Sequence, residues 1–152
     1  MRAFLMLVAM VCALPFVAHA QSLKPKIEIR DAWARLPADG GKSTTVYAYI
    51  VNLTSETDRL LGASSPWADR IVFQHNKMKG YDMIAKVVPS IKIGARQLVK
   101  LGPGEYYLRL EGLTQQLVPD QKIPVTLRFQ NVGRFEMEAS ISNQKIGNMD
   151  IR

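Results

Sequence analysis

Turn signals recur about every ten residues along much of this chain, and they separate short segments in which apolar and polar residues alternate. The signals stand at Lys79-Gly80, Gly94, Gly102-Pro103-Gly104, Pro119-Asp120 and Val132-Gly133. Beyond the first 20 residues, no segment keeps the apolar period of about 3.6 residues that an amphipathic helix shows. Many short strands at this spacing are typical of β-sandwiches and barrels. The pattern therefore predicts a single all-β domain.

The expected strands are rich in β-branched and aromatic residues, which suit a pleated sheet. They cover residues 27–34, 44–53, 71–74, 83–88, 91–93, 97–101, 106–110, 123–129 and 135–141. Residues 52–58 are expected to form a polar connector, and Asn52-Leu53-Thr54, which matches a glycosylation sequon, is interpreted as a turn. Ser65 to Arg70 is expected to form a single helical turn that has Pro66 at its first position.

The first residues have the pattern of a secretory signal. Arg2 gives a positive start, an apolar run from Ala3 to Val17 follows, and Ala18-His19-Ala20 is a small-x-small cleavage site. The run is too short to span a membrane, because a spanning helix needs about 20 apolar residues. We therefore expect residues 1–20 to be a signal peptide, residues 21–142 to form the domain, and residues 143–152 to be a loosely held tail.

Cleavage after Ala20 changes the inventory of chemical groups. Cys12 and His19 leave with the signal, so the mature chain has no cysteine, and its one histidine is His75. Thiolate catalysis and Cys-based metal sites are thereby excluded, and no catalytic constellation remains. Of the 20 Lys and Arg residues one is lost, and of the 13 acidic residues none, which leaves a charge of +6. The basic residues are scattered, which argues against nucleic acid and favours a solubilising surface with weak affinity for anionic lipid or acidic partners.

The segment Tyr106 to Glu111 shows the alternation most clearly. Tyr106, Leu108 and Leu110 would lie on one side of the strand, and Tyr107, Arg109 and Glu111 on the other. Residues at i and i+2 on one side are about 7 Å apart, which is close enough for two ligands to share one metal ion.

Two stretches, Arg59 to Arg70 and Gly102 to Leu113, resemble the framework of the PCu(A)C family of periplasmic copper chaperones. The resemblance extends over Asp31-Ala32-Trp33-Ala34-Arg35 and Pro124 to Phe129, and so over nearly the whole mature chain. It implies a cupredoxin-like, Greek-key β-sandwich in the periplasm, a function in copper delivery linked to respiratory oxidase assembly, and no enzymatic activity. In this family a His, a Met and a His-x-Met pair bind Cu(I).

The spacing of these ligands is retained here, whereas the ligands are not. The family's His-x-Met pair falls on Tyr107 and Arg109, its earlier Met on Ala85 and its first His on Gln74. Ala85 has no donor atom, and Arg109 brings a fixed positive charge to a place where a cation would sit. Ligand softness and electrostatics therefore both oppose Cu(I) at these four positions.

Two interpretations remain open. In the first, copper binds weakly or at a shifted site, for which His75, Met78 and Met83 form a plausible soft trio if a bulge turns His75. The alternative explanation is that these three residues are ordinary surface and packing residues. In the second, the chain is a non-metal binding module that uses the old site as a docking face, with Arg109 as the anchor. Expected partners are a cytochrome oxidase subunit or another periplasmic copper chaperone, with the chain itself a monomer.

Overall fold

The computed structural model describes residues 26–37 and 40–142 of the chain, and their regular structure is a set of strands. These are β1 (Ile27–Arg35), β2 (Ser43–Asn52), β3 (Asp58–Ser64), β4 (Ala68–Lys79), β5 (Asp82–Val88), β6 (Ile91–Ile93), β7 (Leu98–Leu101), β8 (Tyr106–Leu113), β9 (Lys122–Phe129) and β10 (Arg134–Ser142). The all-β prediction is therefore confirmed. Within the described ranges, no helix is long and apolar enough to span a membrane.

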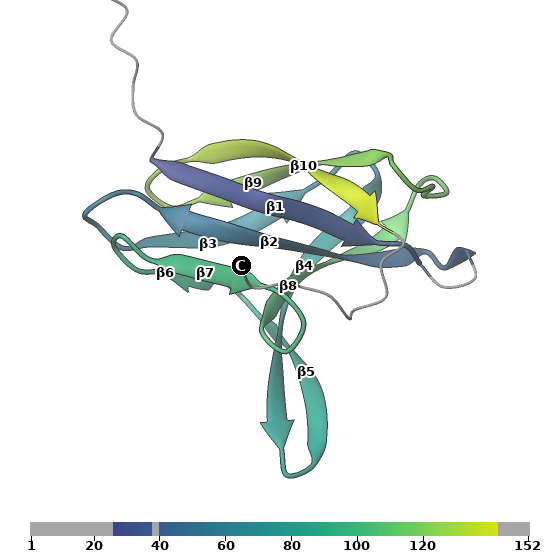
Figure 1. Cartoon of the computed structure of the whole chain (residues 1–152), viewed down its shortest axis with the longest axis horizontal. Coiled ribbons are helices and arrows are strands. Elements are labelled where there is room, and N and C mark those ends of the chain that lie inside the picture. Colours follow the sequence, from purple (N-terminus) through teal and green to yellow (C-terminus); the bar gives the residue numbers. More distant parts are fainter. Residues whose placement is uncertain (1–25, 38–39, 143–152) are drawn as a thin grey trace, which may run out of the picture.

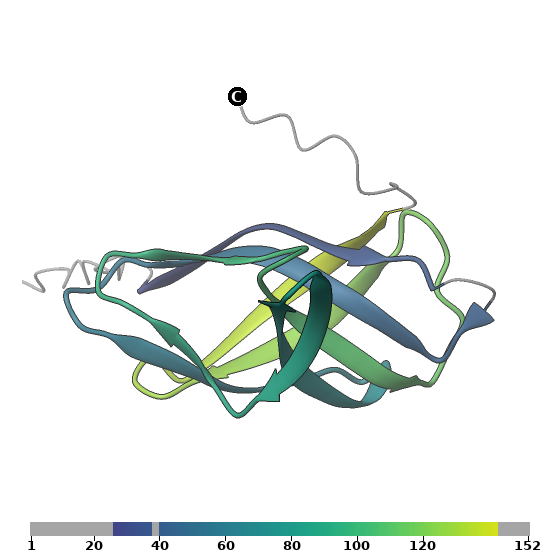
Figure 2. The same ribbon diagram turned by 90° about the horizontal axis from the view of Figure 1, so that it is seen from below.

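The strands join into one continuous sheet in the order β5-β4-β8-β7-β2-β1-β10-β9-β3-β6. The sheet curls over itself into the two layers of a flattened sandwich (Figures 1 and 2). The first and last strands, β1 and β10, lie side by side and pair in parallel, with Trp33 opposite Ser140. This pairing joins the two ends of the described domain.

The core lies between the layers and follows from the alternation along each strand. In β9, for example, Ile123, Val125 and Leu127 are at most 1% exposed, whereas their neighbours are more open. Burial of one such side chain stabilises the fold by about 1.5–3 kcal/mol. The same pattern recurs in β2 and β10, so hydrophobic alternation is the property that selects the inner side of the sheet.

Two buried polar side chains fix the connections between strands. The Asn52 amide is fully buried; its Nδ2 donates to the carbonyl oxygens of Glu56, Ile93 and Gly94, and its Oδ1 accepts from Thr54. The interpretation of the sequon as a turn is therefore confirmed.

Asp58, which is 2% exposed, has the equivalent function at the start of β3. Its carboxylate accepts hydrogen bonds from the backbone N–H groups of Arg59, Asn131 and Val132. The turn between β9 and β10 is thereby tied to β3.

Two local expectations were wrong. The segment after Ser65 is a tight turn: the Trp67 N–H donates to Ser65 Oγ, the Ala68 N–H donates to the Ser65 carbonyl, and β4 begins at once. The serine side chain thus satisfies the backbone locally, and a helical turn is not needed. Strand β3 was not among the expected strands, because the segment Asp58–Ser64 combines charged and small residues that have low strand propensity.

The hairpin formed by β4 and β5 projects from the body of the sandwich (Figure 1). Lys79 pairs with Asp82, so the turn consists of Gly80 and Tyr81 alone, and Gly80 takes a φ of 65°. Glycine at the first position of a two-residue turn favours the type II′ hairpin, and the Lys79-Gly80 signal correctly predicted a turn here. The predicted signal peptide, residues 1–20, and the predicted tail, residues 143–152, lie outside the described residues.

Candidate functional site

Strands β5, β4 and β8 carry the four positions at which the family's copper ligands would be expected. Gln74 lies directly opposite Tyr107 across the β4–β8 ladder. Arg109 is two residues further along β8, and Ala85 lies on β5 opposite Asn76. Because side chains alternate along a strand, all four project from the same side of the sheet. We call Gln74, Ala85, Tyr107 and Arg109 the vacated face.

The other side of the same strands faces the core. Phe73, Leu108 and Leu110, which alternate with the residues of the vacated face, are at most 5% exposed. The vacated face therefore lies on the outside of the sandwich. Its members differ in exposure, from Tyr107, which is only 9% exposed, to Ala85, which is open to solvent.

An aromatic row explains why Tyr107 is covered. The rings of Trp33 and Tyr47 have centroids 4.5 Å apart, and those of Tyr47 and Tyr107 are 6.4 Å apart. A bulge in β1, where Asp31 takes a φ of 49°, shifts the register between Arg30 and Trp33. The extra residue turns Trp33 onto the Tyr47 side of the sheet. Trp33 is therefore a packing residue of this row.

The charge of the vacated face comes from Arg109. Its Nη2 donates to Ser43 Oγ at 3.1 Å, and its Nε lies 3.4 Å from a carboxylate oxygen of Glu111. The other oxygen of that carboxylate lies 2.5 Å from Nη2 of Arg70. Since two guanidinium groups share one carboxylate, this end of the face keeps a net positive charge. The exposed ion pairs themselves stabilise the fold by only about 0–1 kcal/mol.

Burial raises the pKa of Tyr107, and the positive charge of Arg109 partly opposes that shift. Burial likewise raises the pKa of Tyr47. Both phenols thus keep their protons at neutral pH, which removes tyrosinate as a metal ligand. The remaining donor of the face, the Gln74 amide, is hard and weak toward Cu(I). The vacated face does not fit the family's metal.

The structure does not bring the shifted trio together. Met78 and Met83 are direct cross-strand partners near the tip of the hairpin. His75 lies on the other side of the ladder, opposite Tyr106, and its ring stacks on the Tyr106 ring at a centroid distance of 4.1 Å. The register is continuous from Phe73 to Lys79, so no bulge turns His75 toward the methionines. Within the described ranges, His, Cys, Asp and Glu side chains form no cluster of three that would hold a metal.

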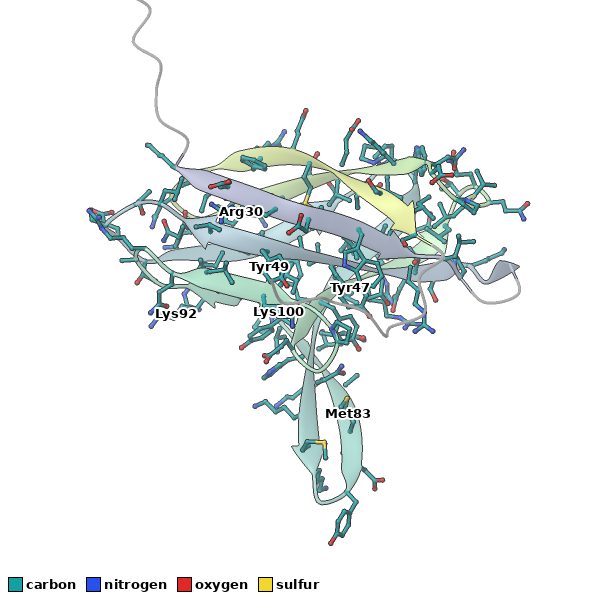
Figure 3. All side chains as sticks on the ribbon, in the orientation of Figure 1. Arg30, Tyr47, Tyr49, Met83, Lys92 and Lys100 are labelled. Atoms are coloured by element: carbon teal, nitrogen blue, oxygen red, sulfur yellow. The ribbon has the colours of Figure 1, made fainter. Side chains whose placement is uncertain are left out.

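The sequence did not reveal how open the hairpin is. Residues 83–88 were expected to be a strand, and β5 confirms this, but it pairs on one side only and is exposed along nearly its whole length. Figure 3 shows Met83 on this hairpin, well away from the body of the sheet. The one sequence signal of this exposure was that Lys77, Lys79 and Lys86 interrupt the apolar residues of the hairpin.

Comparisons with known proteins agree with this architecture. The family described as "LpqE-like: Putative lipoprotein LpqE-like" matches residues 27–141. A protein of Leifsonia xyli subsp. xyli (strain CTCB07), described as "Putative lipoprotein Lxx21020", is 29% identical over 124 residues, which cover 79% of this chain and 74% of the relative.

Solved structures show a similar fold. The copper-bound PCuAC domain from PmoF2 superposes with a TM-score of 0.67 at 22% identity, covering 79% of this chain and 95% of that domain. The solution structure of CuI-DR1885 from Deinococcus radiodurans superposes with a TM-score of 0.58 at 23% identity, covering 83% of each chain. These similarities confirm the cupredoxin-like sandwich predicted from the sequence. With the family match over most of its length, the chain belongs to the LpqE-like family and has the fold of the PCuAC domains.

Proposed function

We propose that the chain is an extracytoplasmic protein of copper delivery that docks a copper-handling partner through the vacated face and does not carry Cu(I) there. One observation carries the proposal: the Arg109 side chain, a fixed cation, lies partly exposed on the outer side of β8, at a position where the family resemblance would put a metal ligand. The similar PCuAC domain from PmoF2 is copper-bound, which supports the link to copper. Expected partners are a cytochrome oxidase subunit or another periplasmic copper chaperone.

The chemistry of the vacated face supports docking. A half-exposed guanidinium lies beside the buried ring of Tyr107, and arginine and tyrosine are enriched among the residues that dominate protein interfaces. Ser43 and Glu111 hold the Arg109 side chain in place, so less conformational entropy is lost on binding. A carboxylate of the partner would fit the fork of the guanidinium.

The docking proposal can be tested with a photo-crosslinking residue in place of Gln74, followed by mass spectrometry of the crosslinked products from periplasm and membranes. We expect the crosslinked partner to be an oxidase subunit or a copper chaperone. Arg109→Ala should weaken that complex about 30-fold, as loss of an interface anchor of about 2 kcal/mol would. A matched crosslinker at Lys122, which is exposed at the start of β9, should give none of these products. Equal products from both positions, or an unchanged affinity after Arg109→Ala, would contradict the proposal.

A second candidate function rests on the two methionines of the hairpin. Met78 and Met83 are cross-strand partners and are 65% and 59% exposed, so two thioethers are available to a soft ion. Two soft ligands favour Cu(I) without enclosing it, which would make a weak transfer site. In competition with a Cu(I) chelator, the double variant Met78→Leu/Met83→Leu should lose the binding, whereas His75→Ala should keep it. Affinity no better than that of an unrelated peptide containing Met and His would exclude this function.

The relatives' description as lipoproteins supports a location outside the cytoplasm. We propose export to the periplasm and cleavage after Ala20, with a monomer as the product. The intact mass of the exported protein tests the cleavage site, because cleavage after Ala20 removes Cys12 and leaves Gln21 as the first residue. A lipid-modified product that retains Cys12 would contradict it.

A further inference from the structure

The projecting hairpin has an unusual surface. We call residues 76–87 the arm; its strand β5 ends the sheet order and pairs only with β4. Figure 1 shows the arm extending beyond the two layers. An arm of this kind adds little to the core, so its side chains are free to meet something outside the molecule.

The arm concentrates exposed apolar area. Of the eight large hydrophobic side chains that are exposed in the described part of the chain, five lie on it: Met78 (65%), Tyr81 (103%), Met83 (59%), Ile84 (45%) and Val87 (58%). Single exposed apolar residues are ordinary, whereas a cluster on one projecting element marks a contact surface. Tyr81 stands at the tip, in the two-residue turn.

The two sides of the arm differ in chemistry. The pairing puts Met78, Met83 and Val87 on one side, together with Ala85. The other side carries Lys77, Lys79 and Lys86, with Ile84 and the arm's one acidic residue, Asp82, among them. The arm is therefore an amphipathic ribbon with a net positive charge and an aromatic tip.

We propose that the arm docks the protein on the surface of an anionic lipid bilayer. Methionine, valine and tyrosine side chains would enter the boundary between headgroups and acyl chains, where tyrosine is favoured. The lysines, on flexible stems, would reach back to the phosphates. The arm projects from the body and carries flexible methionine side chains, which suit a fluid surface better than a shaped protein pocket. The inference goes beyond the proposed function and does not depend on it.

Co-flotation of the exported protein with vesicles tests the proposal, using phosphatidylcholine with and without phosphatidylglycerol. Binding should require phosphatidylglycerol and weaken as salt is added, because salt screens the lysines. Each lysine near an anionic surface contributes about a fivefold gain in affinity, so replacing all three should weaken binding about a hundredfold. The lysine variant is Lys77→Gln/Lys79→Gln/Lys86→Gln, and the apolar variant is Met78→Gln/Tyr81→Ser/Met83→Gln. The matched control replaces exposed apolar residues of the body, Leu53→Gln/Leu98→Gln/Val118→Gln, and should bind like the parent protein.

A spectroscopic measurement keeps the test independent of those multiple substitutions. In the Tyr81→Trp variant, the fluorescence emission of the added tryptophan should shift to the blue on anionic vesicles and be quenched by brominated lipid. Both changes should exceed those of Trp33 and Trp67 in the parent protein. Equal flotation of parent, lysine variant and apolar variant would overturn the proposal, and so would a tryptophan at position 81 that stays in water. Loss of a protein crosslink in the arm variants, without vesicle binding by the parent, would assign the arm to a protein partner and also overturn it.

Discussion

Restoring the family's ligands should convert the vacated face into a Cu(I) site. The four changes are Gln74→His, Ala85→Met, Tyr107→His and Arg109→Met, and all four positions already project from the same side of the β5-β4-β8 ladder. The informative comparison is stepwise: the three-ligand variant that keeps Arg109, the same variant with Arg109→Gln, and the complete quadruple variant. This series separates removal of the charge from gain of a thioether.

The effect of the charge can be worked out from the strand geometry. Positions 107 and 109 lie on one side of β8, so the guanidinium is about 7 Å from the restored ligands. One unit charge at that distance repels Cu(I) by about 0.6–2.4 kcal/mol for an effective dielectric constant between about 80 and 20. Arg109→Gln should therefore tighten Cu(I) binding by the three-ligand variant about 3- to 60-fold, and Arg109→Met should tighten it further.

The substitutions should leave the fold intact. Tyr107→His loses the aromatic contact with Tyr47, which is worth about 0.5–1.5 kcal/mol. Removal of Arg109 loses one hydrogen bond to Ser43 and one exposed ion pair, together about 1–2 kcal/mol. Circular dichroism during thermal unfolding checks that each variant folds before copper is added.

The assay is competition for Cu(I) with a chelator of known affinity. The matched control keeps the other three changes and moves the methionine by one position, with Lys86→Met in place of Ala85→Met, onto the other side of the ribbon. Equal binding by the control and the quadruple variant, or no gain over the parent protein, would refute the assignment of these four residues to the family's ligand positions.

Two further predictions concern stability. Because the pKa values of Tyr47 and Tyr107 are raised in the folded chain, their contribution to the free energy of unfolding is complete below about pH 10 and should fall as the pH rises above it. Urea unfolding at about pH 9 and about pH 11 should therefore show a smaller loss of stability between the two pH values for Tyr47→Phe/Tyr107→Phe than for the parent protein. Equal losses in the two proteins would contradict the burial argument. Asn52→Ala should lower the free energy of unfolding by about 2–4 kcal/mol, because carbonyl groups that are wholly or partly buried lose their donor. Asn131→Ala, which removes one exposed hydrogen bond, is the control. An equal loss of stability in both variants would contradict the structural function given to the Asn52 amide.

Alternation and turn spacing predicted the strands other than β3, most of them to within one residue at each end, although β4 extends well beyond the predicted residues 71–74. They also predicted which residues of β8 face the core, because Leu108 and Leu110 are large and apolar. These results follow from local chemistry, which a single sequence contains. The pairing of Gln74 with Tyr107 across the β4–β8 ladder is a finding of the structure, because the sequence comparison had placed both only at expected ligand positions.

Long-range packing could not be predicted in the same way. The bulge at Asp31, which places Trp33 against Tyr47, has no local signature. Gly112 belongs to the framework resemblance, but its reason is structural: it takes a φ of 68°, and a Cβ there would lie 2.0 Å from the Asp69 carboxylate. β5 is exposed because the strand order leaves it at the end of the sheet, paired with β4 alone. That order depends on contacts distant in the sequence, which local patterns do not contain.

The position of the vacated face on the outer side of the sheet would allow its residues to change while the fold remains. Leu108 is fully buried, whereas the neighbouring Arg109 side chain is 41% exposed on the outer side. Leu108→Ala should therefore lower the free energy of unfolding by about 2–5 kcal/mol, and Arg109→Ala by at most about 2 kcal/mol. Urea unfolding of the two variants measures this difference, and similar losses would show that the outer side supports the fold as much as the core does. If the difference holds, substitutions at the ligand positions alter binding almost independently of stability, so a PCuAC-type sandwich can change what it binds without changing its architecture.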